Sequence, residues 1–191
     1  RDIGLEVELK EFTDGINISN EVISGKSTFG VSSSSLILEK LNNKPIVLLA
    51  SYFKQNALAL AVQEDIKTVN DLKNKRVMAL DYELEYTSIG AMLKDAKISK
   101  DDIVPIPHNF NIDKFINGEV DAMSIFITSQ PYELNKSGIN YNILSPADYG
   151  LYSYDVELFT NKKVVQKNPK MVENFINATN KGWKYAFEHK N

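Results

Sequence analysis

A short pattern that occurs twice is the sequence feature that most constrains the fold. Residues 22–31 and 115–124 each carry an apolar helix end, a glycine, a charged residue and a short apolar strand. Small polar residues and a further helical pattern follow each strand, at residues 32–35 and 124–129. Repeated strand–helix units predict an α/β protein with two related lobes, and ligands of such folds bind beyond the carboxyl ends of the strands.

A run of four serines stands where a helix at residues 35–41 is expected to begin. The first N–H groups of a helix lack partners and carry partial positive charge, so a helix start favours an anionic or acceptor-rich group. Neighbouring hydroxyls add hydrogen-bonding partners for a ligand. We therefore predict that Ser32, Ser33 and Ser34 bind a ligand. The alternative is that these serines only cap the helix.

Composition restricts the class of protein. The 191 residues are enough for one large domain or two small lobes, and 43% hydrophobic and 25% charged residues are typical of a globular protein. A net charge of −3 argues against a nucleic-acid partner. Without cysteine, the chain has no disulfide and no thiol nucleophile. The chain begins without Met or a leader, which we interpret as a processed or excised fragment.

Hydrophobic periodicity predicts alternating strands and helices. Alternation at residues 5–9 predicts a strand with one buried face, and the apolar run at residues 46–51 predicts a strand buried on both faces. Further strands are expected at residues 28–31, 57–62, 76–80, 103–106, 120–125, 141–144 and 156–160. Helices are expected at residues 16–24, 35–41, 68–75, 112–117 and 128–136 and from residue 168 onward, and another is expected just after residues 81–83, through Ile89, Met92 and Leu93.

The expected lobes are built from interleaved segments, because no low-complexity segment or flexible linker divides the chain. We assign residues 1–55 and 156–191 to lobe one and residues 56–155 to lobe two. The hinge is expected near residues 54–57 and 153–156.

Aromatic and acidic residues at expected strand ends and crossings are the strongest candidates for ligand contacts. Core packing is the alternative for Phe53 and Phe126. Tyr149 and Tyr154 stand in an irregular connection, where a functional role is favoured. Asp121 is expected to be structural. With the serines, the candidate ligand-binding residues are Asp14, Ser32, Ser33, Ser34, Phe53, Asp81, Tyr82, Asn109, Phe126, Tyr149, Tyr154 and Asp155.

The sequence lacks patterns typical of catalysis. His108 and His189 are far apart, and neither has another histidine nearby to form a metal site. Ser33 or Ser34 with His108 would lack the Gly-x-Ser-x-Gly turn of many serine hydrolases. We therefore predict that the chain is not an enzyme and has no catalytic residue, no metal site and no cofactor.

Six phrases carry a resemblance to a known group: GVSSS, DLKNKRV, FINGEVDAM, SPADYG, LFT and GWKYA. Together they resemble the type 2 periplasmic binding proteins, and most of all the branch named for thiamine-pyrimidine synthesis and pyrimidine-precursor binding. The similarity covers nearly the whole chain. It implies the two-lobed α/β fold of that group with interleaved lobes. The family usually opens with a strand and a helix before the equivalent of residues 5–9, and these roughly thirty residues are missing here.

The resemblance implies three functions. The first is an extracytoplasmic sensor domain that closes around a ligand, because SPADYG and the HNFN phrase at residues 108–111 resemble domains of bacterial sensor kinases and cyclic-dinucleotide synthases. The second is the substrate-binding protein of an ABC transporter for a thiamine pyrimidine precursor. The third is a pyrimidine synthase-like enzyme, but that branch carries a cysteine cluster where this chain has residues 32–35.

The candidate residues also suggest the ligand class. Tyrosines and serines without clustered Arg or Lys suit a small planar or zwitterionic molecule better than an oxyanion, which calls for charge-assisted donors. We expect a pyrimidine-like heterocycle, with an amino acid as the alternative. The expected partners are membrane signalling modules of the same polypeptide or an ABC transporter, and the expected location is periplasmic.

Overall fold

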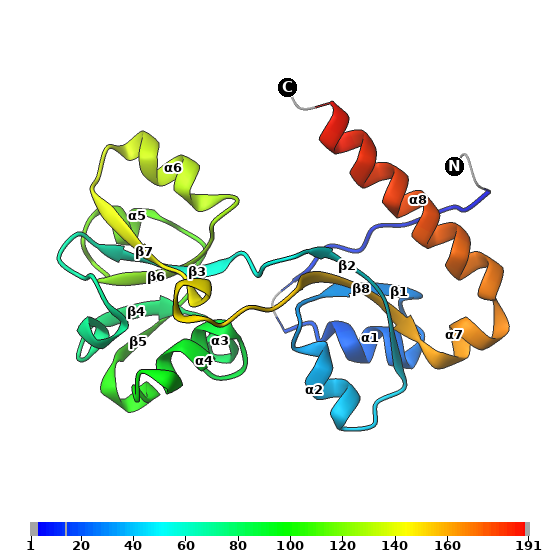
Figure 1. Cartoon of the computed structure of the whole chain (residues 1–191), viewed down its shortest axis with the longest axis horizontal. Coiled ribbons are helices and arrows are strands. Elements are labelled where there is room, and N and C mark those ends of the chain that lie inside the picture. Colours follow the sequence, from blue (N-terminus) through cyan, green and yellow to red (C-terminus); the bar gives the residue numbers. More distant parts are fainter. Residues whose placement is uncertain (1–3, 14, 190–191) are drawn as a thin grey trace. The chain divides into compact units, whose positions relative to one another are not determined.

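The structure, a computed structural model, describes residues 4–13 and 15–189 (Figure 1). The chain forms two compact units. Unit 1 consists of Arg1–Tyr52 and Asp155–Asn191, and unit 2 of Phe53–Tyr154. Within the described residues, none of the helices combines the length and apolar character needed to cross a lipid bilayer.

Unit 2 is a five-stranded sheet with helices on both faces. Its strand order is β5-β4-β6-β3-β7, with β4 parallel to β5 and β6, and β3 antiparallel to β6 and β7. Its elements are β3 (Leu58–Gln63), the 3-10 turn η1 (Val69–Leu72), β4 (Arg76–Ala79), α3 (Asp81–Tyr86), α4 (Ser88–Asp95), η2 (Lys100–Asp102), β5 (Val104–Pro107), α5 (Asp113–Ile116), β6 (Ala122–Phe126), α6 (Gln130–Ser137), β7 (Tyr141–Leu144) and η3 (Pro146–Tyr149).

Both faces of the unit 2 sheet are buried. Successive side chains of a strand point to opposite faces, so Leu58 and Leu60 of β3 join one core cluster while Ala59 and Ala61 join the other. α3 and α4 cover the first cluster, and α5 and α6 cover the second (Figure 1). This double cover explains why β3 reads as a continuous apolar run.

Unit 1 has a smaller sheet, of order β1-β8-β2, in which β1 is antiparallel to β8. Its core cluster consists of Val22, Leu36, Ile46 and Phe159. The elements are α1 (Ile18–Ser24), β1 (Phe29–Ser32), α2 (Leu36–Leu41), β2 (Ile46–Phe53), β8 (Asp155–Asn161), α7 (Lys162–Lys167) and α8 (Pro169–Glu188).

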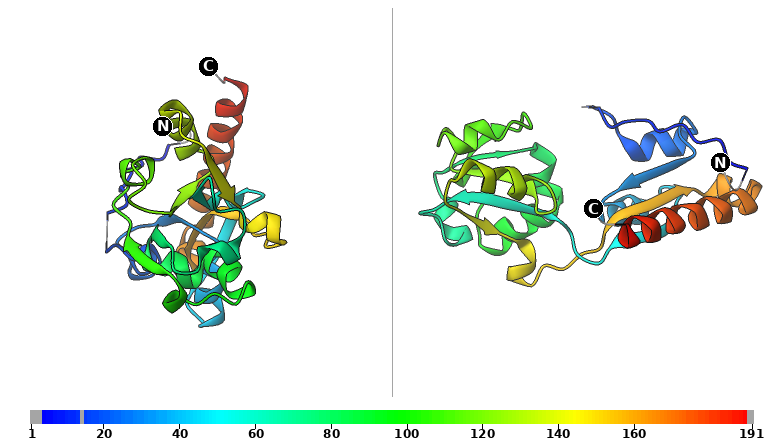
Figure 2. Two further views of the ribbon diagram at one scale, coloured as in Figure 1. Left: turned by 90° about the vertical axis from the view of Figure 1, so that its left-hand side faces the viewer. Right: turned by 90° about the horizontal axis from the view of Figure 1, so that it is seen from above.

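The long helix α8 runs alongside the unit 1 sheet (Figure 2). Its contacts with the sheet include aromatic side chains. The rings of Phe29 and Phe175 stack with centroids 3.9 Å apart, and those of Tyr52 and Trp183 with centroids 5.4 Å apart. The Tyr52 hydroxyl donates to Asn180 Oδ1 at 3.0 Å. These contacts join α8 to β1 and β2.

The repeated sequence pattern corresponds to two equivalent pieces of structure. α1 ends at Gly25 and leads to β1, and α5 is followed by Gly118 and then β6. Both glycines have a positive φ, 82° and 69°, a backbone conformation that glycine adopts without steric cost. A helix follows each strand, as predicted.

Two predicted strands differ from the structure. Residues 5–9 form no strand, and Leu9 is 87% exposed, because no described strand pairs with them. β2 is present over the predicted residues, but it lies at an edge of the sheet rather than at its centre. Leu48 in its middle is 57% exposed, so the predicted burial on both faces is wrong.

Candidate functional site

Four strands of unit 2 end at one edge of its sheet. β4, β5 and β6 are parallel, and β7 has the direction of β6 because β3 is antiparallel to both. The loops after these four strands therefore begin at the same edge, which we call the carboxyl edge of unit 2. Open α/β sheets bind ligands at such edges.

Several predicted residues meet at the carboxyl edge of unit 2. Asp81 and Tyr82 open α3 directly after β4, Asn109 follows β5, and Phe126 ends β6. These are three neighbouring strands. Phe53, the last residue of β2, lies five residues before β3 and is not placed at this edge by the strand register. The sequence prediction thus named residues that the fold collects at one edge.

The polar residues of this set already have partners. Asp81 is exposed and forms an ion pair with Lys100 at 2.9 Å, and this hydrogen bond raises the pKa of Lys100. Asn109 Oδ1 accepts from the backbone N–H of Asn111 at 3.1 Å. No partner of the Asn109 amide N–H groups is found among the described residues, and a ligand at Asp81 would compete with Lys100.

The two predicted tyrosines lie near the end of unit 2. Tyr149 is the last residue of η3, which follows β7 and therefore begins at the carboxyl edge. Tyr154 is the last residue of the unit. Both rings are exposed, at 39% and 60%, so neither serves the core.

A hydrogen-bonded chain that sequence reasoning did not assign to the site underlies this edge. The buried Glu83 accepts through Oε2 from the Ser124 hydroxyl at 2.6 Å and from the Leu80 N–H at 2.9 Å. The backbone oxygen of Ser124 lies 3.0 Å from His108 Nε2. The chain joins α3, β6 and the loop after β5, which fixes the three loops relative to one another.

Only one of these hydrogen bonds, the one between Glu83 and Leu80, could be predicted from a local sequence pattern. A glutamate three residues after the residue that precedes a helix commonly bonds back to its N–H, and Glu83 has this spacing from Leu80. The partnership of Glu83 with Ser124 and that of Ser124 with His108 depend on which strands are neighbours. No local pattern reports that order.

Unit 1 has a corresponding cluster at the end of β1. Ser32, the last residue of β1, lies opposite Glu157 of β8. The Ser51 hydroxyl of β2 donates to Glu157 Oε2 at 2.5 Å, although the glutamate is only 4% exposed. The predicted Asp155 is also buried, two residues earlier on β8. Glu157 and Ser51 were missed because only the strand order brings them beside Ser32.

The backbone between the two buried acids is unusual. Val156 has a φ of 54°, a left-handed conformation that is a genuine outlier for a β-branched residue. Strained backbone of this kind clusters at binding and catalytic sites. Its place between Asp155 and Glu157 supports a functional role for this end of the sheet.

The serine turn does not cap α2 through a side chain. Ser35 at the N-cap position makes no side-chain cap bond within the described residues, and its hydroxyl lies 2.7 Å from that of Ser33. Backbone bonds from Leu36 to the Ser33 oxygen and from Ile37 to the Ser34 oxygen begin the helix instead. The Ser33 hydroxyl also accepts from the Ser35 N–H, at a long 3.4 Å, so the capping alternative keeps only this weak bond.

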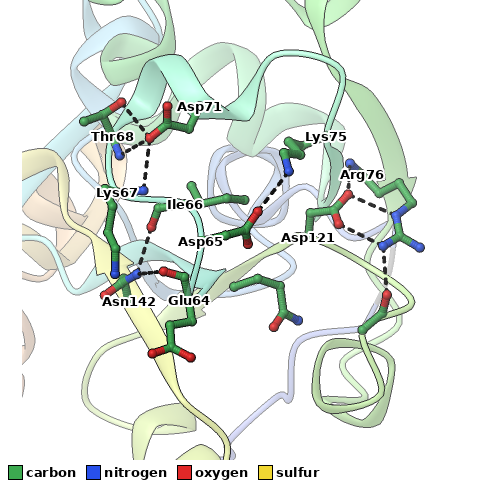
Figure 3. A network of polar contacts seen from close by, with 12 residues as sticks. Glu64, Asp65, Ile66, Lys67, Thr68, Asp71, Lys75, Arg76, Asp121 and Asn142 are labelled. Carbon is green, nitrogen blue, oxygen red and sulfur yellow. Dashed lines mark hydrogen bonds and ion pairs between the residues drawn. The ribbon is translucent and has the colours of Figure 1, made fainter.

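The opposite edge of unit 2 holds a structural network (Figure 3). Asp121 accepts from Arg76 through the backbone N–H at 2.7 Å, Nε at 3.0 Å and Nη2 at 2.8 Å. These bonds lower the pKa of Asp121, with the side-chain hydrogen bond as the largest cause. They tie β4 to the turn before β6, which agrees with the expectation that Asp121 is structural.

The remaining predictions concern residue 14 and metals. Asp14 lies outside the described residues. Among residues 4–13 and 15–189, no group of three or more His, Asp or Glu side chains is arranged to hold a metal ion. The described edges offer hydroxyls, carboxylates and aromatic rings, groups that can hydrogen-bond to a ligand and stack on it.

Comparison with known proteins identifies a family. The family described as NMT1/THI5 like matches residues 1–191, the full length of the chain. No curated protein matches the sequence. Solved structures with the same arrangement of elements are periplasmic binding proteins of the type 2 fold.

Three solved structures illustrate the likeness. A putative periplasmic sulfonate-binding protein from Methylobacillus flagellatus has a TM-score of 0.65 and 19% identity, covering 88% of this chain and 52% of its own. The substrate-binding protein of an amino acid ABC transporter has a TM-score of 0.66 and 18% identity, covering 98% and 78%. A substrate-binding protein from Streptococcus pneumoniae with bound histidine has a TM-score of 0.59 and 17% identity, covering 88% and 67%.

These TM-scores and coverages establish the fold of the chain. The chain spans about half the length of the sulfonate-binding protein. The predicted two-lobed α/β fold class is confirmed, and so is the predicted resemblance to the type 2 periplasmic binding proteins.

Proposed function

Because the chain belongs to the NMT1/THI5-like family and has the type 2 periplasmic binding protein fold, we propose that it is an extracytoplasmic domain that binds a small planar or zwitterionic molecule. The observation that carries the proposal is the chemistry of the two strand edges. Exposed aromatic side chains and the carboxyl groups of Asp81 and Glu83 occur at the carboxyl edge of unit 2, and the Ser51 hydroxyl bonds to the buried Glu157 near the end of β1 in unit 1.

The buried carboxylates favour a ligand with hydrogen-bond donors. Glu157 and Glu83 are both buried at these edges, and neither forms an ion pair among the described residues. A carboxylate repels an oxyanion and accepts from an amino or ammonium group. We therefore propose a heterocycle with an amino group, such as a pyrimidine, as the ligand, with an amino acid as the alternative. The sulfonate named for one structural relative fits this chemistry less well.

A thermal-shift screen of heterocycles, amino acids and oxyanions tests the ligand class. We expect stabilisation by an aminopyrimidine and none by sulfonate or phosphate. Calorimetry on Tyr149→Ala and Tyr154→Ala then tests the rings, and either change is expected to lower affinity at least tenfold, about 1.4 kcal/mol. Stabilisation by oxyanions alone would reject the proposed ligand class. Unchanged affinity in both variants would reject the proposed stacking by these tyrosines.

We further propose that the domain serves as the ligand sensor of a membrane signalling protein. SPADYG and HNFN support this role by their resemblance to sensor domains. Delivery to an ABC transporter is the second candidate, favoured by the transport proteins among the structural relatives. The complete gene distinguishes them. A membrane helix joined to a kinase or synthase domain supports the sensor, and a secreted protein with no further domain supports the carrier.

We also propose that the domain does no chemistry on its ligand. Four serines, residues 32–35, occupy the place of the cysteine cluster of the synthase branch, and a hydroxyl is a poorer nucleophile and metal ligand than a thiolate. Incubation with pyridoxal phosphate and iron tests this directly. Formation of a pyrimidine product would contradict the proposal.

A further inference from the structure

The loop after β5 is held by its own side chains. His108 Nδ1 accepts from the Phe110 N–H at 2.9 Å, Asn109 Oδ1 from the Asn111 N–H at 3.1 Å, and Asn111 Oδ1 from the Asp113 N–H at 2.8 Å. Each bond spans two residues and mimics a backbone turn. Three in succession restrict a segment that contains no regular backbone pairing.

His108 also connects the loop to β6 by a hydrogen bond. β4 lies between β5 and β6 in the strand order, yet His108 Nε2 lies 3.0 Å from the Ser124 oxygen of β6. The His108 side chain therefore reaches past β4 to β6. Because Nδ1 accepts from an N–H, neutral His108 has its proton on Nε2 and donates it to Ser124.

These bonds hold Phe110 in place while leaving its side chain exposed to solvent. Its φ is 59°, an uncommon conformation for a bulky residue, and its side chain is 68% exposed. The ring lies 4.8 Å from that of His108 at a tilt of 43°. A loop that served only to connect β5 to α5 would need neither the strained backbone nor an exposed phenyl ring. Strained residues of this kind mark binding sites.

We propose that Phe110 is a ligand-binding residue of unit 2 and that His108 is its positioning residue. The exposed ring supplies an apolar face for a flat heterocycle, at the edge that also holds Tyr82 and Phe126. His108 sets the place of that ring through its two bonds, one to the Phe110 N–H and one to β6. The inference rests on the proposed function and adds the groups that recognise the flat face of the ligand.

The first experiment is calorimetric titration of the whole chain with 4-amino-2-methylpyrimidine, a flat heterocycle with one amino group. Phe110→Ala is expected to weaken binding at least tenfold. The matched control is Phe187→Ala, which removes a phenyl ring of similar exposure, 63%, from α8 in unit 1 and is expected to leave affinity unchanged.

The second experiment tests the positioning role. His108→Ala removes both bonds and is expected to weaken binding as much as Phe110→Ala. In the Phe110→Ala background it is expected to cost nothing further, because His108 acts only through that ring. His108→Asn restores an acceptor at the place of Nδ1 and is expected to recover part of the affinity. In ligand-free protein, the NMR coupling constant of the Phe110 amide is expected to change with His108→Ala and to return with His108→Asn.

The outcomes separate this inference from the proposed function. If no aminopyrimidine or amino acid binds the unaltered chain, both are wrong. If the aminopyrimidine binds the chain and Phe110→Ala equally well, or if Phe187→Ala weakens binding as much, only the role of Phe110 is wrong. If the losses from His108→Ala and Phe110→Ala add fully, His108 is not the positioning residue.

Discussion

The two units differ in how completely their sheets are buried. In unit 2, helices cover both faces, and the five residues from Leu58 to Val62 are all buried. In unit 1, one core cluster has four buried members, and β2 is mostly half-exposed. The comparison indicates that the carboxyl edge of unit 2 belongs to a sheet buried on both faces, whereas the stability of unit 1 depends on a few side chains.

Truncating one buried phenylalanine in each unit is the largest test of this difference. Phe115→Ala in unit 2 and Phe159→Ala in unit 1 each remove a fully buried ring and are expected to cost about 3–5 kcal/mol. With so few core residues, unit 1 is expected to unfold under native conditions in Phe159→Ala, while unit 2 survives Phe115→Ala. Hydrogen exchange read separately in β8 and β3 measures this. Equal survival of both units would contradict the comparison.

A smaller change tests the tightness of the unit 1 core. A Cβ at Gly30 would lie 2.6 Å from Phe159 and 2.9 Å from Val22, so Gly30→Ala is expected to cost about 1–3 kcal/mol by overpacking. Gly182→Ala is the control, because nothing lies within 4 Å of its added Cβ and it sits inside α8. This control is expected to raise stability by up to about 1 kcal/mol in the same denaturant titration. A harmless Gly30→Ala would show that the core is loose.

The Asp121–Arg76 pair predicts a pH dependence for unit 2. Because hydrogen bonds from Arg76 lower the pKa of Asp121, its contribution is fully present above the ordinary Asp pKa of about 3.9 and is lost as pH falls through the lower folded value. Asp121→Asn is expected to cost about 1 kcal/mol at neutral pH, a modest value because Arg76 is half-exposed. In denaturant titrations, the free energies of unfolding of the unaltered protein and of Asp121→Asn should become equal in acid. If the two proteins differ in free energy of unfolding by the same amount from pH 7 to pH 3, the Asp121–Arg76 pair is not the source of that difference.

The smallest expected effect on stability is at the serine turn of unit 1. Ser33→Ala with Ser34→Ala is expected to weaken binding of an aminopyrimidine while the melting temperature barely changes. The N-cap residue Ser35 is retained, and the change removes only the 2.7 Å contact between the Ser33 and Ser35 hydroxyls and a long bond, 3.4 Å, from the Ser35 N–H to Ser33 Oγ. A lost cap would instead cost about 1 kcal/mol. A clear fall in melting temperature with unchanged affinity would make the serines structural.

Much of the fold was predictable because its signals are local. The glycines that end two helices, Gly25 and Gly118, and the apolar run of β3 are each signalled by neighbouring residues. The misjudged segments are those whose state depends on strand neighbours. Residues 5–9 alternate like a strand but pair with no described strand, and β2 has the apolar run of a central strand but lies at an edge.

The residues of the candidate site also fall into those with a local sequence signal and those brought together only by strand order. Position after a strand pointed to Asp81, Asn109 and Phe126, which the fold brings to one edge. Glu157 with Ser51 and Glu83 with Ser124 are bonds between residues 41 to 106 positions apart, and no spacing rule connects them. Their discovery required the strand order and the strand register.

Hydrogen exchange of the whole chain with and without 4-amino-2-methylpyrimidine tests the central claim most directly. The claim is that the carboxyl edge of unit 2 binds a small molecule. We predict that the amides of residues 108–111 exchange more slowly as the ligand concentration rises. Unchanged exchange of this segment at high ligand concentration would contradict it.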